Sequence, residues 1–223
     1  MSIVELLWHW LTQPENWTGP DGIPVRFGQH LWYSGLSLVI AALVALPVGL
    51  VTGHTGRGGF LAINSANAAR ALPTIGIVIL VVIFVGIGLL PVLAALVALA
   101  IPAVLVNTYE GIRTVDPELR EAAYGMGLTG SQVLWRVELP VALPLVLLGM
   151  RQAAIQIVST ATIAAYVGLG GLGRYIFDGL ARQDYEIVVG GAALAALLAV
   201  VAEVAFVLAA RAAVSPGVRQ RAR

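Results

Sequence analysis

A stretch without any charged residue, from Ala71 to Tyr109, most constrains what this chain can fold into. A helix needs roughly 20 mostly apolar residues to cross the hydrocarbon core of a bilayer, so this stretch is long enough for two crossings. Over all 223 residues, 59% are hydrophobic and 11% are charged, whereas a soluble domain carries about 25% charged residues. The sequence therefore predicts an all-α, polytopic membrane protein.

The chain divides into five apolar segments long enough to be transmembrane helices. A Gly/Pro turn signal from Gly86 to Pro91 separates the second segment from the third. A polar, glycine-rich link over 53–70 precedes the second segment, and a charged loop over about 111–139 follows the third. The predicted spans cover about residues 31–52, 71–89, 92–110, 140–166 and 187–210.

Arginine is distributed unevenly between the two sides that five spans define. Cytoplasmic segments of membrane proteins carry an excess of Lys and Arg. If the N-terminus is outside, the outer side holds Arg26, Arg174 and Arg182. The inner side then holds Arg57, Arg70, Arg113, Arg120, Arg136, Arg211, Arg219, Arg221 and Arg223. This bias predicts an external N-terminus, a cytoplasmic charged loop and a cytoplasmic C-terminus.

The N-terminal segment, residues 1–26, is open to two interpretations. Its first helix places on one face the residues Ile3, Leu6, Leu7 and Trp10. Because Trp prefers the headgroup level, the segment either lies along one membrane surface or packs as a cap on the bundle. A secretory signal peptide is not expected, because a basic start is missing and Glu5 interrupts the apolar run.

The charged loop carries signals for two short helices. Asp116-Pro117-Glu118 is typical of a helix start, because Asp caps the first turn, Pro fits it and Glu favours the positive end. Gly125 and Gly127 supply a stop. Thr129 with Gln132 fits a capping box for the second helix, which is expected to end near Leu139-Pro140.

The first loop helix has an apolar stripe at positions i, i+3, i+4 and i+7, formed by Leu119, Ala122, Ala123 and Met126. Small Ala side chains allow another surface to approach closely. The stripe is therefore a docking surface, or else it packs on the protein's own bundle.

The same loop resembles the EAA motif of bacterial ABC-importer permeases. That motif runs Glu-Ala-Ala, three residues, Gly, nine residues, Ile, one residue and Leu-Pro. The matching positions are Glu121-Ala122-Ala123, Gly127 and Val137-Glu138-Leu139-Pro140, with Val137 in place of Ile. The resemblance implies a type I permease bundle in the bacterial plasma membrane, whose loop grips a cytoplasmic ATPase through Glu121, Ala122, Ala123 and Gly127, flanked by Leu119 and Met126.

The resemblance also implies the partners. They are ATPase subunits that bind ATP and Mg²⁺, a second permease chain (identical or paralogous), an extracytoplasmic solute-binding protein and the lipid bilayer. No cofactor of this chain itself and no nucleic acid are expected.

Two shorter strings resemble the osmoprotectant branch of these permeases. They are the run from Ala161 to Gly168 and Leu72-Pro73-Thr74. This resemblance covers about residues 27–213 and implies a permease domain there, followed by a basic cytoplasmic tail over 214–223. The implied cargo is a small compatible solute such as glycine betaine, choline, carnitine or proline. A permease for methionine or another amino acid remains an alternative.

Two charged residues fall inside predicted spans, Arg151 in the fourth and Glu203 in the fifth. Such charges usually face the bundle interior and find partners, so the two side chains either pair or are satisfied separately. Polar residues near them, Gln152, Gln156 and Thr160, are candidates to line a pathway together with Tyr166. An alternative of a different class is an intramembrane enzyme that uses Arg151, Glu203 and these polar side chains.

Several other patterns indicate no chemistry. The Gly168–Gly173 stretch fits G-x-G-x-x-G, but that fingerprint needs a βαβ unit, so a turn that lets the chain bend back is expected instead. A Walker A sequence is absent, and there is no Cys for a disulfide or a thiolate metal site. The three histidines, His9, His30 and His54, lack the spacing of metal ligands.

Overall fold

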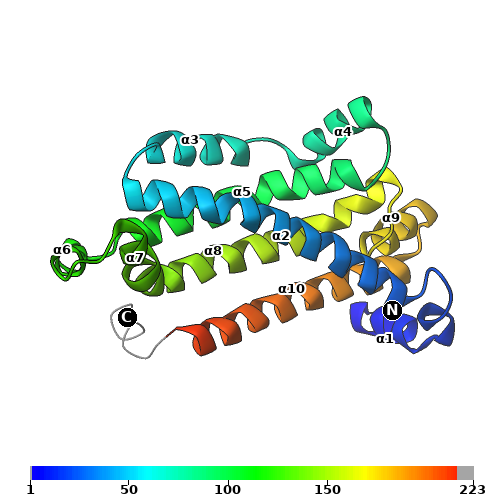
Figure 1. Cartoon of the computed structure of the whole chain (residues 1–223). Coiled ribbons are helices and arrows are strands. Elements are labelled where there is room, and N and C mark those ends of the chain that lie inside the picture. Colours follow the sequence, from blue (N-terminus) through cyan, green and yellow to red (C-terminus); the bar gives the residue numbers. More distant parts are fainter. Residues whose placement is uncertain (1, 215–223) are drawn as a thin grey trace. The chain divides into compact units, whose positions relative to one another are not determined.

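A computed structural model describes residues 2–214, and within that range every regular element is helical (Figure 1). The helices before the charged loop are α1 (Ile3–Thr12), η1 (Pro14–Trp17), α2 (Ile23–Thr55), α3 (Gly59–Arg70), α4 (Thr74–Val85) and α5 (Leu89–Arg113). The loop and the remaining chain form α6 (Pro117–Gly125), α7 (Gly130–Val133), η2 (Leu134–Glu138), α8 (Leu139–Thr160), η3 (Ala161–Val167), α9 (Gly173–Arg182) and α10 (Tyr185–Ala213). The predicted basic tail, apart from Val214, lies outside the described residues.

The all-α membrane fold is confirmed, with one change in the second span. Four described helices are long and apolar enough to cross a membrane, and they include α2, α5 and α10; the fourth runs from Gly130 to Val167. A fifth span exists only if α3 and α4 count together as one broken span. The prediction of a continuous second span over 71–89 is wrong, because the helix found there, α4, covers only the 12 residues Thr74–Val85. It is separated from α3 at Pro73, which lacks the backbone N–H that a helix interior uses.

The polar link over 53–70 also differs from its prediction as a connection, because most of it is the helix α3. The second loop helix does not end near Leu139-Pro140 either. The chain passes from α7 through the π-helical turn η2 directly into α8. Pro140 directly follows this π-helical turn, and the helix continues through it.

The chain forms two compact units. Among the described residues, unit 1 comprises 2–38, 73–97 and 154–202, and unit 2 comprises 39–72, 98–153 and 203–214. Helices α2, α5, α8 and α10 contribute residues to both units.

Unit 2 is built around close contacts of glycine with neighbouring helices. The residues concerned are Gly49 and Gly53 on α2, Gly111 on α5 and Gly149 on α8. A Cβ at Gly49 would lie 2.8 Å from the Cβ of Thr108, and one at Gly53 would lie 2.8 Å from the Cβ of Ile112. Small residues let membrane helices approach this closely, and the gain is van der Waals contact rather than a hydrophobic driving force.

Unit 1 is held by the glycine-rich stretch after η3. His30 on α2 is fully buried; its Nε2 donates to the carbonyl oxygen of Val158 over 2.9 Å, and its Nδ1 accepts from the backbone N–H of Leu172. Gly171 has φ +94°, a conformation that suits glycine. The G-x-G-x-x-G string therefore serves a tight turn packed on α2, as the sequence predicts for a chain that bends back.

The N-terminal segment packs as a cap within unit 1, and its position along a membrane surface stays a prediction. Trp10 is 1% exposed, and its ring lies so close to Gly190 that a Cβ there would be 2.2 Å away. The ring also meets Tyr175 edge to face, with 5.1 Å between centroids. Burial raises the pKa of Tyr175 to about 12, so its hydroxyl keeps its hydrogen and donates to the backbone oxygen of Asp21.

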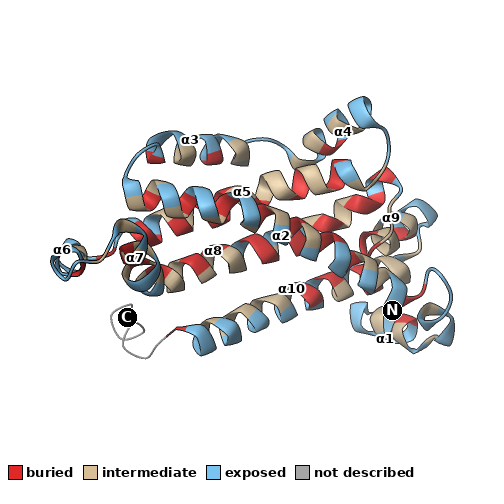
Figure 2. Ribbon diagram, in the orientation of Figure 1, coloured by how far each residue is buried: buried red, intermediate tan, exposed pale blue. Residues whose placement is uncertain are grey.

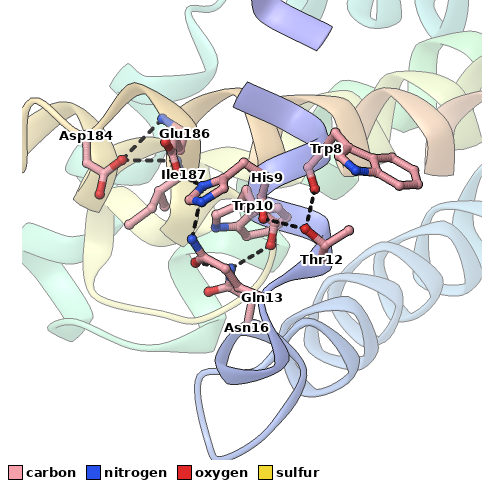
Figure 3. Close-up of polar contacts among 9 residues, drawn as sticks. All are labelled: Trp8, His9, Trp10, Thr12, Gln13, Asn16, Asp184, Glu186 and Ile187. Atoms are coloured by element: carbon pink, nitrogen blue, oxygen red, sulfur yellow. Dashed lines mark hydrogen bonds and ion pairs between the residues drawn. The ribbon is translucent and has the colours of Figure 1, made fainter. Parts of the chain in front are cut away.

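Polar contacts complete the attachment of the cap to α10 (Figure 3). His9 Nδ1 lies 2.8 Å from Glu186 Oε2, and Asn16 Nδ2 donates to the carbonyl oxygen of Trp10. Three apolar side chains of α1, Ile3, Val4 and Trp8, remain exposed. The cap thus keeps part of its apolar surface uncovered within the described chain.

Candidate functional site

The predicted loop helix forms where the sequence places it. Asp116 caps α6 by accepting from the backbone N–H of Glu118 over 2.9 Å, and Pro117 occupies the first turn. The Thr129 backbone N–H donates to Gln132 Oε1 over 2.8 Å, as a capping box requires. In Figure 1, α6 projects beyond the ends of the neighbouring helices of unit 2, and most of its residues are exposed (Figure 2).

The apolar stripe on α6 does not form one surface. Glu121, Ala122 and Met126 are exposed, Met126 to 73%, and Leu119 is partly exposed. Ala123 is 1% exposed and packs inside the chain. The expectation that all four stripe residues share one docking surface is therefore wrong for Ala123. A larger side chain there would clash within the protein, before any partner is reached.

Gly127, directly after α6, has φ +84°. A Cβ added to it would meet nothing within 4 Å. The positive φ therefore accounts for a glycine at this position, whereas close approach within the chain does not.

Behind α6 lies a buried ionic cluster that the sequence analysis missed. The carboxylate of Glu138, in η2, is 1% exposed. Its Oε1 lies 2.9 Å from Arg120 Nε on α6, and its Oε2 lies 2.6 Å from His54 Nδ1 at the end of α2. Arg120 also donates to the backbone oxygen of Ile112 near the end of α5. The carboxylate thus connects η2, α6 and the end of α2, and Arg120 adds α5 as a fourth segment of unit 2.

A weak signal for this cluster exists in the sequence. Glu138 stands between Val137 and Leu139 at the start of a predicted span, where an unpaired carboxylate would be costly. Its partners are remote, because Arg120 lies in the loop and His54 follows the first span, so spacing alone does not identify them.

The structure brings together the two charges predicted inside spans. Arg151 Nε on α8 lies 2.9 Å from Glu203 Oε2 on α10. Both atoms are buried and form an ion pair without hydrogen-bond geometry. The two side chains remain 36% and 35% exposed, so the pair is only partly covered within this chain.

The candidate pathway residues lie in different surroundings. Gln152 accepts from Asn107 Nδ2 over 3.2 Å, while Gln156 is exposed on the same face of α8 and Thr160 is half-buried at its end. Tyr166 is exposed and lines a mostly apolar hollow of about 320 Å³ beside α4, and its ring lies 6.2 Å from that of Phe177. Within residues 2–214, no group of three or more His, Asp or Glu side chains is arranged to hold a metal ion.

The comparisons with known proteins agree with the helical architecture. Residues 45–220 match the family described as "Binding-protein-dependent transport system inner membrane component". The chain belongs to this family. It is therefore an inner membrane component of a transport system, and the resemblance found in the charged loop is confirmed at the level of the family.

Several curated relatives of this inner membrane component are about one-third identical to it. The glycine betaine/carnitine/choline transport system permease protein OpuCB of Bacillus subtilis is 34% identical over 79% of this chain and 81% of its own length. The choline transport system permease protein OpuBB of the same organism is 34% identical over 82% and 84%. The osmoprotectant import permease protein OsmW of Salmonella typhimurium is 34% identical over 78% and 83%.

Solved structures support the fold of this inner membrane component. Chains from two crystal forms of the MetNI methionine ABC transporter, both inward facing, superpose with TM-scores of 0.71 and 0.72. The first is 24% identical, and the match covers 84% of this chain and 94% of the MetNI chain. The second is 22% identical, and the match covers 96% of this chain and 100% of the MetNI chain. At this identity the likeness concerns the fold alone.

Proposed function

We propose that this chain is the permease subunit of an ATP-driven importer that takes up a small compatible solute of the glycine betaine, choline and carnitine class. The observation that carries the proposal is the set of relatives about 34% identical over about four-fifths of the chain, each named as a permease for solutes of this class. The likeness to the MetNI chains gives less support for methionine as the solute, because at their lower identity it concerns the architecture only.

The loop helix α6 is the proposed contact with a cytoplasmic ATPase. Its exposed residues include Glu118, Glu121 and Ala122, and with Met126 directly after the helix they offer a small projecting surface that combines negative charge with apolar contact. Gly127 shapes the exit from the helix, and Ala123 holds its inner face against unit 2. ATP and Mg²⁺ bind to the partner, and this chain transmits the movement.

The proposed orientation places the N-terminus outside and the charged loop inside. The arginines of the compact units support it, because Arg26, Arg174 and Arg182 all fall in unit 1. The described arginines that are assigned to the inner side, Arg57, Arg70, Arg113, Arg120, Arg136 and Arg211, all fall in unit 2. An extracytoplasmic binding protein would then meet the side that carries Arg26, Arg174 and Arg182, and the ATPase would meet the side that carries the charged loop.

A polar pathway along α8 is part of the proposal. Gln152 and Gln156 lie one helical turn apart and are exposed on α8, whose other polar residues are Arg151, Ser159 and Thr160. Amide groups facing lipid would remain unsatisfied, so these positions face water, solute or a second permease chain. Thr160 and Tyr166 continue the proposed pathway.

The test is uptake by a reconstituted transporter. The permease, purified through a tag with the ATPase and binding protein encoded beside it, is placed in proteoliposomes containing ATP. Glycine betaine, choline, carnitine and methionine are supplied in turn as labelled solutes. The proposal requires ATP-dependent accumulation of at least one of the first three. Uptake of methionine alone would favour the amino-acid alternative, and conversion of a solute by the permease without partners would favour an enzyme.

A further inference from the structure

The docking helix α6 carries a charged residue on its inner side as well as on its outer side. Arg120 lies on α6 next to the exposed Glu121, but its guanidinium points inward to the buried carboxylate of Glu138. The side chain of Arg120 is 18% exposed, and that of His54, the second partner, is 19% exposed. The cluster is therefore largely shielded from solvent and from salt.

Shielding makes this cluster stiffer than a surface ion pair. Breaking a buried pair leaves one charge uncompensated, which costs far more than separating two exposed charges. Each oxygen of Glu138 has its own partner, so neither Arg120 nor His54 replaces the other. As a result, α6 cannot shift relative to the ends of α2 and η2 unless these segments move with it or the pairs are broken.

The local backbone also favours movement of these segments as one body. Glu138 closes the π-helical turn η2, and α8 follows without interruption. A mid-helix π-turn is a frequent marker of functional sites. Beside the cluster, Ile112, Ala142 and Val146 form a buried core with Leu46 and Leu50, so α2, α5 and α8 are already packed together at this level.

We propose that Glu138 is a positioning residue of the transporter, which joins the docking helix to the ends of α2 and α8 through Arg120 and His54. The inference rests on the proposed function, because it takes α6 to be moved by an ATPase. Through this joint, displacement of α6 reaches the spans that border the solute pathway. Without the ion pairs of Glu138, the ATPase still docks and hydrolyses ATP, but part of the displacement of α6 is absorbed by the loop and does not reach the spans.

The test measures how many solute molecules enter per ATP hydrolysed in the complete transporter with its binding protein. Glu138→Gln keeps the shape of the side chain and removes its charge. We expect the ratio to fall about fivefold or more, the lower end of a typical coupling between sites, while ATPase co-purifies as in the wild type. Glu110→Gln is the matched control, because Glu110 is an exposed carboxylate at the end of α5 in the same unit.

His54→Gln provides a second variant, since it leaves the pair of Arg120 with Glu138 in place and should lower the ratio less. A merely structural role predicts less assembled transporter but an unchanged ratio for each complex, and that result would overturn the proposal. A wild-type ratio in both variants at normal abundance would overturn it as well. Failure of the wild type to import any of the proposed solutes is a separate outcome, because it rejects the proposed function regardless of Glu138.

Discussion

At the scale of single residues, a substitution of Gly127 tests the role proposed for the loop most directly. A β-branched residue at its φ of +84° is strained by about 1–2 kcal/mol. Gly127→Val should therefore distort the exit from α6, strongly reducing both ATPase association and solute uptake at normal membrane abundance. Gly127→Asn is the control, because Asn tolerates this conformation and open space surrounds the Cβ. Equal co-purification of the ATPase with both variants would contradict the role given to the backbone here.

The pair of Arg151 with Glu203 predicts a reciprocal rescue. Arg151→Glu or Glu203→Arg places two like charges at the contact that now measures 2.9 Å. Each single reversal should lower stability by less than the roughly 3–5 kcal/mol of a fully buried pair, because each side chain is about one-third exposed. The double exchange should recover part of this loss, measured by thermal unfolding in detergent and by uptake. A double variant no better than the worse single one would contradict the pairing.

At the scale of elements, the N-terminal cap packs so tightly against α10 that adding one methyl group at Gly190 tests the contact. Gly190→Ala forces the Trp10 ring away and should destabilise the cap by about 1–3 kcal/mol, the usual cost of overpacking. Protease cleavage within the first 22 residues should then become faster. Gly28→Ala on α2 is the control, since a Cβ there meets nothing within 4 Å. If both variants are cleaved at the same rate, the packing of Trp10 does not hold the cap.

Some helix boundaries can be predicted from the sequence, and others cannot. The caps of α6 and α7 are local, so Asp116, Thr129 and Gln132 predict them correctly. The break at Pro73 and the continuation past Pro140 depend on surroundings, because proline interrupts the helix at one position and is accommodated within it at the other. The contact of Glu138 with His54 joins residues more than 80 positions apart in the chain, and a single sequence does not reveal that pairing.

At the scale of the whole molecule, the arginine bias predicts the topology. An epitope tag at the N-terminus should be cleaved by external protease in spheroplasts, and a tag at the C-terminus should be protected until the membrane is opened. The physical reason is the excess of arginine on one side, nine against three. Protection of both tags, or exposure of the C-terminal tag alone, would contradict the orientation. The family and the helical architecture follow from hydropathy and one motif, whereas the orientation still rests on charge.

The burial of Trp10 has an optical consequence. Of the five tryptophans, Trp10 alone is buried, while Trp8, Trp17, Trp32 and Trp135 are between 48% and 71% exposed. An indole between the ring of Tyr175 and the backbone of Gly190 is sheltered from aqueous quenchers. In a variant that keeps only this tryptophan, emission colour and acrylamide quenching would follow the attachment of the cap in real time. The chain thus contains its own reporter for whether binding protein or ATP loosens its N-terminal end.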